Sequence, residues 1–209
     1  MAIYLDSAVV AEAEAASKLG WIKGITTNPA LLAKSDLSPE DTLRALSDIV
    51  SGEICYQLTS PDFEDMVTEA HKVREIVGTQ IVLKIPAIEL GFRVAAFLSK
   101  EIPCAITGIY TPAQVAVAVE TGVKYVIPYV NRATRFLGDG LAVVRNMSSV
   151  VGETEIMAAS IKSPEEAVAT LQAGAHHLTL PLNVLTAMTA NEFSQQAVDE
   201  FALNGCGIS

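Results

Sequence analysis

The stretch Gln80-Ile81-Val82-Leu83-Lys84-Ile85-Pro86 reads as a short apolar strand with a single charged residue near its end. Burying an unpaired ammonium is costly, because a low-dielectric surrounding disfavours the charged form. A lysine that gives up its proton becomes a nucleophile toward carbonyl carbon. A lysine at the end of a strand can also extend its methylene stem to water. The rest of the chain is needed to decide between these two interpretations of Lys84.

Apolar runs of this kind recur along the chain and alternate with segments that have helical spacing. The eight strand-like runs are 2–6, 22–26, 54–58, 81–85, 104–107, 125–128, 155–159 and 177–180. The helical patterns include 7–19, 39–50, 61–77, 88–100, a helix opening at Thr111-Pro112, one opening at 163–166, 182–189 and 192–203. Ser38 is an expected N-cap, and Ser163 with Glu166 is an expected capping box.

Eight strands that alternate with helices and are apolar throughout indicate a parallel sheet covered on both faces. The predicted fold is α/β, a single (β/α)8 TIM barrel over 1–209, with 192–209 as a C-terminal helix and tail. A doubly wound open sheet is the alternative. It is disfavoured because Asp6-Ser7-Ala8-Val9, after the first strand, has no glycine-rich phosphate loop.

Composition narrows the functional classes. The 209 residues are 50% hydrophobic, with a formal net charge of −10. That acidity argues against nucleic-acid binding, which needs a basic face. No apolar run reaches the length of a membrane-spanning helix, and the first residues lack the pattern of a signal peptide. The three cysteines and three histidines show no paired or metal-ligand spacing. We expect a cytoplasmic protein that binds neither membrane nor metal.

Polar residues gather at the carboxyl ends of the predicted strands, where a parallel barrel has its active site. They are Asp6, Thr26, Thr27, Asn28, Gln57, Lys84, Thr107, Tyr129, Asn131, Arg132, Ser160 and Lys162. Each also has an ordinary structural explanation. Asp6 and Asn28 could be helix caps, the threonines fit strand ends, and Tyr129 could be a packed aromatic. The eighth strand ends in Pro181 and contributes no polar group by this count. Seven polar ends out of eight favour a catalytic pocket around Lys84.

These residues fall into motifs that resemble a known family, the short transaldolases and fructose-6-phosphate aldolases. The matching motifs are Tyr4-Leu5-Asp6, Gly24-Ile25-Thr26-Thr27-Asn28-Pro29, Val82-Leu83-Lys84-Ile85-Pro86, Pro128-Tyr129-Val130-Asn131-Arg132 and Ala158-Ala159-Ser160. The resemblance runs over nearly the whole chain and keeps the order and spacing of the strands. It implies a (β/α)8 barrel and class I aldol chemistry with no cofactor and no metal.

The resemblance also implies roles for the catalytic residues. Lys84 attacks the ketone of a sugar phosphate and forms a Schiff base, which accepts electrons while the C3–C4 bond breaks. Asp6 transfers protons in the carbinolamine and C4-hydroxyl steps. Thr107, Gln57 and Tyr129 position a catalytic water.

Four further residues are implied in substrate binding. Thr26 and Asn28 hold the dihydroxyacetone part. Arg132 and Ser160 bind the distal phosphate, the arginine as a fork onto its oxygens. Lys162 is a weaker candidate for the same phosphate. The expected partners are therefore small-molecule sugar phosphates.

Two positions divide the family by activity. Transaldolases tend to have Glu in place of Gln57 and Phe in place of Tyr129, so the chain resembles the aldolase branch. We predict cleavage of fructose 6-phosphate to dihydroxyacetone and glyceraldehyde 3-phosphate, and the reverse addition. The alternatives are a transaldolase of the pentose phosphate pathway, which transfers the dihydroxyacetone unit to another sugar phosphate, and a non-catalytic sugar-phosphate-binding barrel. The third is disfavoured because Lys84 and Asp6 are both present.

The chain departs from the family pattern at three places. Ala30 stands where serine is usual, 136–140 differs from the expected glycine-rich stretch, and the tail 205–209 is short. In the family the last helix packs on a neighbouring subunit in ring-like assemblies. We therefore expect a homo-oligomer, a pentamer or decamer, with the short tail leaving its exact size open.

Overall fold

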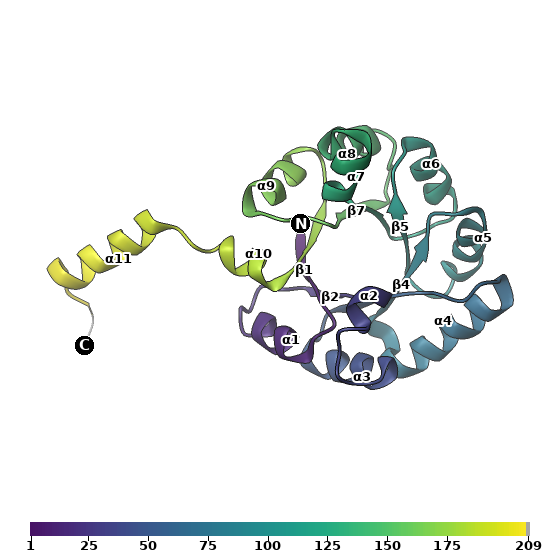
Figure 1. Cartoon of the computed structure of the whole chain (residues 1–209), viewed down its shortest axis with the longest axis horizontal. Helices are drawn as coiled ribbons and strands as arrows, with labels where there is room; N and C mark the ends of the chain where they lie inside the picture. Colours follow the sequence, from purple (N-terminus) through teal and green to yellow (C-terminus); the bar gives the residue numbers. More distant parts are fainter. Residues whose placement is uncertain (208–209) are drawn as a thin grey trace.

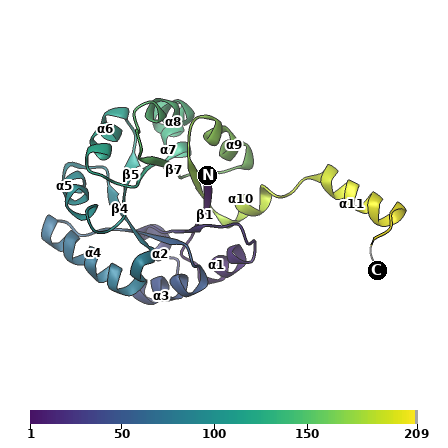
Figure 2. The same ribbon diagram turned by 180° about the vertical axis from the view of Figure 1, so that it is seen from behind.

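Eight parallel strands close into a barrel in the computed structural model, which describes residues 1–207 (Figures 1 and 2). In order from β1 to β8 the strands are Ala2–Asp6, Gly24–Thr26, Glu53–Gln57, Ile81–Pro86, Cys104–Ile109, Tyr125–Pro128, Glu155–Ala158 and His177–Leu180. β1 pairs with both β2 and β8, which closes the sheet. The predicted (β/α)8 barrel is confirmed, and the open sheet is excluded.

Helices surround the barrel. From α1 to α11 they are Val10–Ser17, Pro29–Leu32, Pro39–Ile49, Phe63–Val77, Glu89–Leu98, Pro112–Glu120, Val130–Leu137, Gly140–Ser148, Pro164–Gln172, Leu182–Ala187 and Glu192–Asn204, with a 3₁₀ turn at Gly78–Gln80. Ser38 caps α3 and Thr111 forms a capping box at α6, where proline occupies the first turn. The four-residue helix α2 and the two helices between β6 and β7, α7 and α8, were not among the helical segments predicted from the sequence.

The capping box predicted at α9 is wrong in one half. Ser163 accepts the backbone N–H of Glu166, as an N-cap should, at 3.2 Å. The Glu166 carboxylate, however, does not return to the N-cap residue. It accepts the backbone N–H of Lys162, one residue earlier, at 2.7 Å. The side chain therefore holds the loop that enters the helix rather than the helix end itself.

The core has two parts because strand side chains alternate between the inside of the barrel and the helices. The larger part lies between strands and helices and includes Leu5, Ile25 and Leu83. The smaller part fills the barrel and consists of Tyr4, Cys55, Val82, Ala105, Tyr125, Ile127, Met157 and Ala159. Within it, Glu53 accepts hydrogen bonds from the hydroxyls of Tyr4 and Tyr125 and pairs with Lys124. This packing closes the interior on the side away from the carboxyl ends of the strands.

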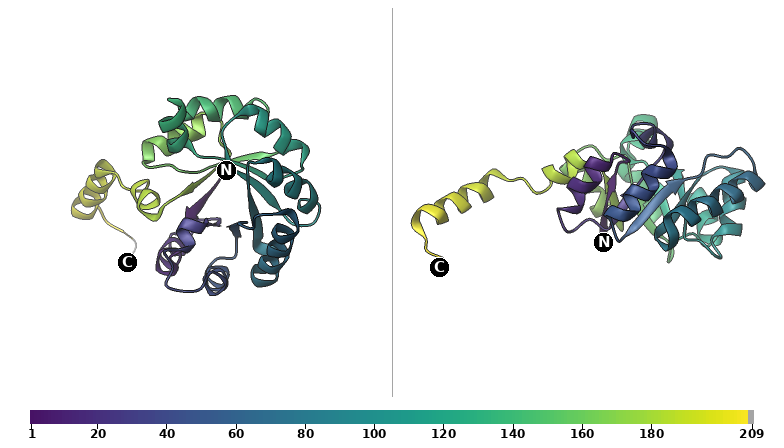
Figure 3. Two further views of the ribbon diagram at one scale, coloured as in Figure 1. Left: turned by 45° about the vertical axis from the view of Figure 1, so that its right-hand side comes forward. Right: turned by 90° about the horizontal axis from the view of Figure 1, so that it is seen from below.

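The last helix, α11, stands away from the barrel in every view (Figures 1 and 3). None of its residues is buried. The predicted segment 192–209 begins with this helix, and its residues 208–209 lie outside the described part of the chain. Across residues 1–207, each helix is too short or too polar to cross a membrane.

Candidate active site

The strand registers bring the polar residues at the carboxyl ends to one face. Asp6 lies beside Thr26 on β1 and β2, and Gln57 lies beside Lys84 on β3 and β4. Neighbours in register on parallel strands point to the same side. Lys84 also shares its side with Val82, which packs inside the barrel. The side chains of these polar residues therefore continue the inner face of the barrel toward its mouth.

A cavity of about 530 Å³ opens at this mouth. Its lining residues are Asp6, Asn28, Pro29, Ala30, Leu31, Lys34, Gln57, Lys84, Tyr129, Arg132, Ala159, Ser160 and Lys162. Seven of the nine predicted site residues are among them, and Thr26 and Thr107 lie behind the lining. Four cations and one carboxylate make the cavity attractive to an anion, although the chain as a whole is acidic.

Lys84 is almost fully buried, with 2% of its surface exposed. Its Nζ donates a hydrogen bond of 2.8 Å to the backbone carbonyl of Thr27. Within residues 1–207 no carboxylate oxygen lies within 4.0 Å of this amine. The surface-lysine interpretation is therefore wrong, and the amine is held at the bottom of the cavity by one neutral acceptor.

Burial and two neighbouring groups act in opposite directions on the pKa of Asp6. Burial raises the pKa of the Asp6 carboxyl above its ordinary value, and the nearby Lys84 ammonium and a hydrogen bond from Thr26 oppose that shift. The Thr26 hydroxyl lies 2.8 Å from Asp6 Oδ1 and 2.6 Å from the Thr179 hydroxyl. The cap of α1 is Val9, without a side-chain hydrogen bond. Asp6 is thus free of the capping role, and a carboxyl with a raised pKa suits proton transfer.

Tyr129 connects two of the predicted residues. Its hydroxyl lies 2.9 Å from the Thr107 hydroxyl, and the Arg132 guanidinium lies 4.7 Å from the centre of its ring. The cation–ring contact fixes Arg132 over the tyrosine face. A water at the mouth would thus meet the Tyr129 hydroxyl, which Thr107 orients from behind.

Asn28 combines the two roles considered for it. Its Oδ1 accepts the backbone N–H of Leu31 at 3.0 Å and so caps α2. Asn28 also lines the cavity. With the oxygen occupied by the cap, the amide NH₂ is the group left to donate to a substrate oxygen.

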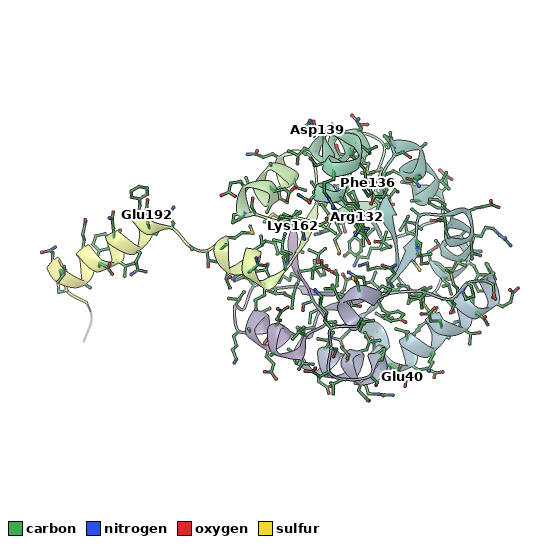
Figure 4. The ribbon with its side chains drawn as sticks, in the orientation of Figure 1. Glu40, Arg132, Phe136, Asp139, Lys162 and Glu192 are labelled. Carbon is green, nitrogen blue, oxygen red and sulfur yellow. The ribbon has the colours of Figure 1, made fainter. Side chains whose placement is uncertain are left out.

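Ser160 has the only left-handed backbone among the non-glycine residues described, with φ of 60°. That conformation costs roughly 1–3 kcal/mol and persists where surrounding contacts fix it. Here the N–H groups of Val130 and Asn131 donate to the carbonyls of Ala159 and Ser160, each at 2.9 Å. The segment after β7 is therefore joined to the start of α7, and Arg132 and Lys162 lie on the same rim of the barrel (Figure 4).

Sequence reasoning missed two residues of this region. Thr179 points into the barrel and bonds Thr26, so β8 does contribute a polar group. The period of two along β8 would have indicated it, since Thr179 lies two residues beyond His177, which packs against Tyr4 and Tyr125 inside the barrel. Lys34 lines the cavity from the loop after α2, and no sequence signal marked it. Among residues 1–207, no group of three potential ligands gathers to hold a metal ion.

The family model and the curated relatives agree on one family. The model of the transaldolase/fructose-6-phosphate aldolase family matches residues 3–204. A probable transaldolase of Nitrosopumilus maritimus is 30% identical, covering 96% of this chain and 93% of the relative. A probable transaldolase of a Hydrogenobaculum species is 34% identical, with 96% and 94% covered. The solved orotidine 5'-monophosphate decarboxylase of Metallosphaera sedula superposes with a TM-score of 0.64 at 13% identity, over 95% and 96% of the two chains. That last likeness shows the fold alone.

Proposed function

Because the chain belongs to the transaldolase/fructose-6-phosphate aldolase family of enzymes, we propose that it breaks the C3–C4 bond of a ketose phosphate through a Schiff base on Lys84. The observation that carries the proposal is the buried Lys84 amine, which has one neutral hydrogen-bond partner and a cavity in front of it. The amine of a lysine adds to a carbonyl carbon as a nucleophile, and the cavity leaves room for a ketone in front of it.

The proposed sequence uses only groups at the cavity. Lys84 Nζ adds to the C2 ketone, and loss of water gives an iminium. The Asp6 carboxylate takes the C4-hydroxyl proton, the C3–C4 bond breaks, and its electron pair moves to the iminium nitrogen to form an enamine. The aldehyde phosphate leaves. Protonation of the enamine carbon and addition of water at C2 then release dihydroxyacetone and free the Lys84 amine.

Binding is proposed at two ends of the cavity. The Asn28 amide donates to the hydroxyls of the dihydroxyacetone unit, while Thr26 acts from behind through its hydrogen bond to Asp6. Arg132 and Ser160 take the distal phosphate, because a guanidinium presents paired donors to two phosphate oxygens. Within residues 1–207 no carboxylate lies within 4.0 Å of the Arg132 guanidinium, which leaves it available to a ligand.

Two fates of the enamine are favoured by different observations. Gln57 beside Lys84, and the Tyr129 hydroxyl on Thr107, favour hydrolysis, because they offer partners to a water; this is the fructose-6-phosphate aldolase activity. The names of the curated relatives, probable transaldolases, favour transfer of the dihydroxyacetone unit to an acceptor aldehyde. We propose hydrolytic cleavage as the main activity and transfer as the second candidate.

The test is release of glyceraldehyde 3-phosphate from fructose 6-phosphate, with and without erythrose 4-phosphate. Release without the acceptor supports the aldolase. Release that requires the acceptor overturns it in favour of the transaldolase. Borohydride reduction in the presence of dihydroxyacetone separates both enzymes from a non-catalytic binder, because only a Schiff base gives a stable adduct.

Tyr129→Phe is expected to shift the enzyme from cleavage toward transfer. The ring that supports Arg132 stays, and only the hydroxyl that bonds Thr107 is lost. We expect the ratio of transfer to cleavage to rise about tenfold or more, in the range of a lost acid–base partner. The measurement is glyceraldehyde 3-phosphate release with and without erythrose 4-phosphate. An unchanged ratio would mean that the hydroxyl does not govern hydrolysis.

Helix α11 is proposed to pack on a second copy of this chain in a ring-like pentamer or decamer. Phe193 and Phe201 are 69% and 74% exposed and, with Ala197, form a stripe four residues apart, which is the spacing of an apolar helix face. The helix stands away from its own barrel, so that barrel leaves the stripe uncovered (Figure 3).

Mass measurement by light scattering tests this assembly. The chain with Phe193→Ser and Phe201→Ser is expected to dissociate to smaller species. The polar control Gln196→Ser should keep the mass of the unmodified chain. A monomeric unmodified chain, or a double variant of unchanged mass, would overturn the proposal.

A further inference from the structure

Glu166 takes no part in the proposed reaction, but its contacts point to a positioning role. We propose that its carboxylate fixes the spacing between the two segments that carry the phosphate-binding groups, the loop 160–163 and the start of α7. The inference rests on the proposed function, because it assumes that Arg132 and Ser160 face a phosphate.

The loop side of this contact is well defined. Glu166 Oε2 accepts the backbone N–H of Lys162 at 2.7 Å, and the Glu166 N–H in turn donates to the Ser163 hydroxyl at 3.2 Å. The loop is therefore tied to the first turn of α9 in both directions. The N–H of Lys162 lies two residues from Ser160, so the tie restrains the left-handed turn at Ser160.

The helix side is reached by the other carboxylate oxygen. Glu166 Oε1 accepts a long hydrogen bond, 3.5 Å, from the side-chain amide of Asn131. Asn131 immediately precedes Arg132 on α7, and its own backbone N–H donates to Ser160. One carboxylate thus bridges the residue before the guanidinium and the loop that contains Ser160 and Lys162.

This arrangement matters because the two segments come from different strands. Arg132 follows β6 and Ser160 follows β7. These strands share two register pairs, and beyond them the backbone bonds from Val130 and Asn131 to Ala159 and Ser160 are the main-chain link between the two segments. A phosphate held by both segments requires a fixed distance between them, and a displacement of about 1 Å can cost up to about a hundredfold in rate. Glu166 reaches both segments while not lining the cavity. It is therefore expected to act on ligand affinity through its neighbours, with no contact of its own.

The experiment compares Glu166→Ala with Glu165→Ala. Glu165 is the exposed neighbour in the same helical turn. Its removal changes the charge of the helix start equally and takes away a contact with the Ser163 hydroxyl, but it leaves the bond from the Lys162 N–H to Glu166 in place. The readouts are the dissociation constant of inorganic phosphate and the KM values for glyceraldehyde 3-phosphate and unphosphorylated glyceraldehyde, with dihydroxyacetone as donor. Glu166→Ala is expected to raise the dissociation constant of phosphate and the KM for glyceraldehyde 3-phosphate about tenfold, which is within the cost of a small misplacement. The KM for unphosphorylated glyceraldehyde should change by no more than about twofold.

Conservative variants complete the test. Glu166→Gln keeps an oxygen for the Lys162 N–H and is expected to restore most of the affinity. If Glu166→Ala does not fold, Asn131→Ala removes the α7 contact alone. It should also raise the dissociation constant of phosphate, by a smaller factor. Equal losses for both aldehydes, an unchanged phosphate constant, or the same effect in Glu165→Ala would overturn the positioning role.

Failure of the proposed function would have a different signature. A chain that gives no borohydride adduct with dihydroxyacetone is not a Schiff-base enzyme, whatever Glu166 does. The phosphate-binding measurement does not depend on turnover and decides the role of Glu166 in that case as well. A wild-type chain that does not bind phosphate overturns the inference directly.

Discussion

Lys84→Met is expected to abolish both cleavage and transfer while leaving the barrel folded. The thioether cannot add to a carbonyl, so kcat should fall by about 10⁴-fold or more, as when a covalent nucleophile is removed from an enzyme. Methionine is similar in length and fills the same buried space. Because the native amine is almost fully buried with one neutral partner, its removal should stabilise the chain by about 1–3 kcal/mol.

The measurements for Lys84 are product release, borohydride trapping with mass analysis, and the urea unfolding midpoint. Lys162→Met is the matched control, because Lys162 is an exposed cation of the same cavity. The control should keep the adduct and lose affinity only for phosphorylated substrates. An adduct that persists in Lys84→Met and disappears in Lys162→Met would place the Schiff base on Lys162 and contradict the proposed role of Lys84.

The barrel could be predicted because its pattern is repeated eight times. The runs 2–6, 125–128 and 177–180 match β1, β6 and β8 residue for residue, and the others differ by one or two residues at their ends. The short helix α2 escaped prediction, since four residues carry too little periodicity to show a face. Its cap, Asn28, was a candidate for capping but had no helix assigned to it.

The site could be predicted where its residues lie at the ends of strands, and less well where their position depends on contacts between segments that are distant in the sequence. Thr179 was missed because Pro181, the residue that follows β8, was considered in place of the inward-facing residue of the strand. Lys34 and Glu166 come from a loop and a helix turn, and their places depend on contacts between distant segments. The roles of the site residues, the cytoplasmic location and the oligomer remain predictions.

Asp6→Asn is expected to give the second largest loss of activity. The amide oxygen can still accept the hydrogen bond from Thr26, so the geometry stays while the proton acceptor is lost. We expect kcat for cleavage to fall by about 10²–10⁴-fold, the range of a positioned acid–base group. The Lys84 adduct with dihydroxyacetone should still form, although more slowly, because no C4-hydroxyl proton is removed in that reaction. An adduct yield that falls in parallel with cleavage would instead assign Asp6 to carbinolamine formation alone.

The pH dependence of stability provides an independent check on Asp6, because burial raises the pKa of its carboxyl above the ordinary value of 3.8. A group with a raised pKa in the folded state stabilises that state fully below the unfolded pKa, and this contribution is lost as pH rises through the folded pKa. The free energy of unfolding of Asp6→Asn should therefore equal that of the native chain below about pH 3.8 and exceed it at neutral pH. Unfolding midpoints at acidic and neutral pH measure the difference. Lys84→Met should raise the pKa of Asp6 further, since Lys84 is the largest of the groups that lower it. The stability that Asp6→Asn adds at neutral pH should then be larger in the Lys84→Met background, and this difference would demonstrate the coupling.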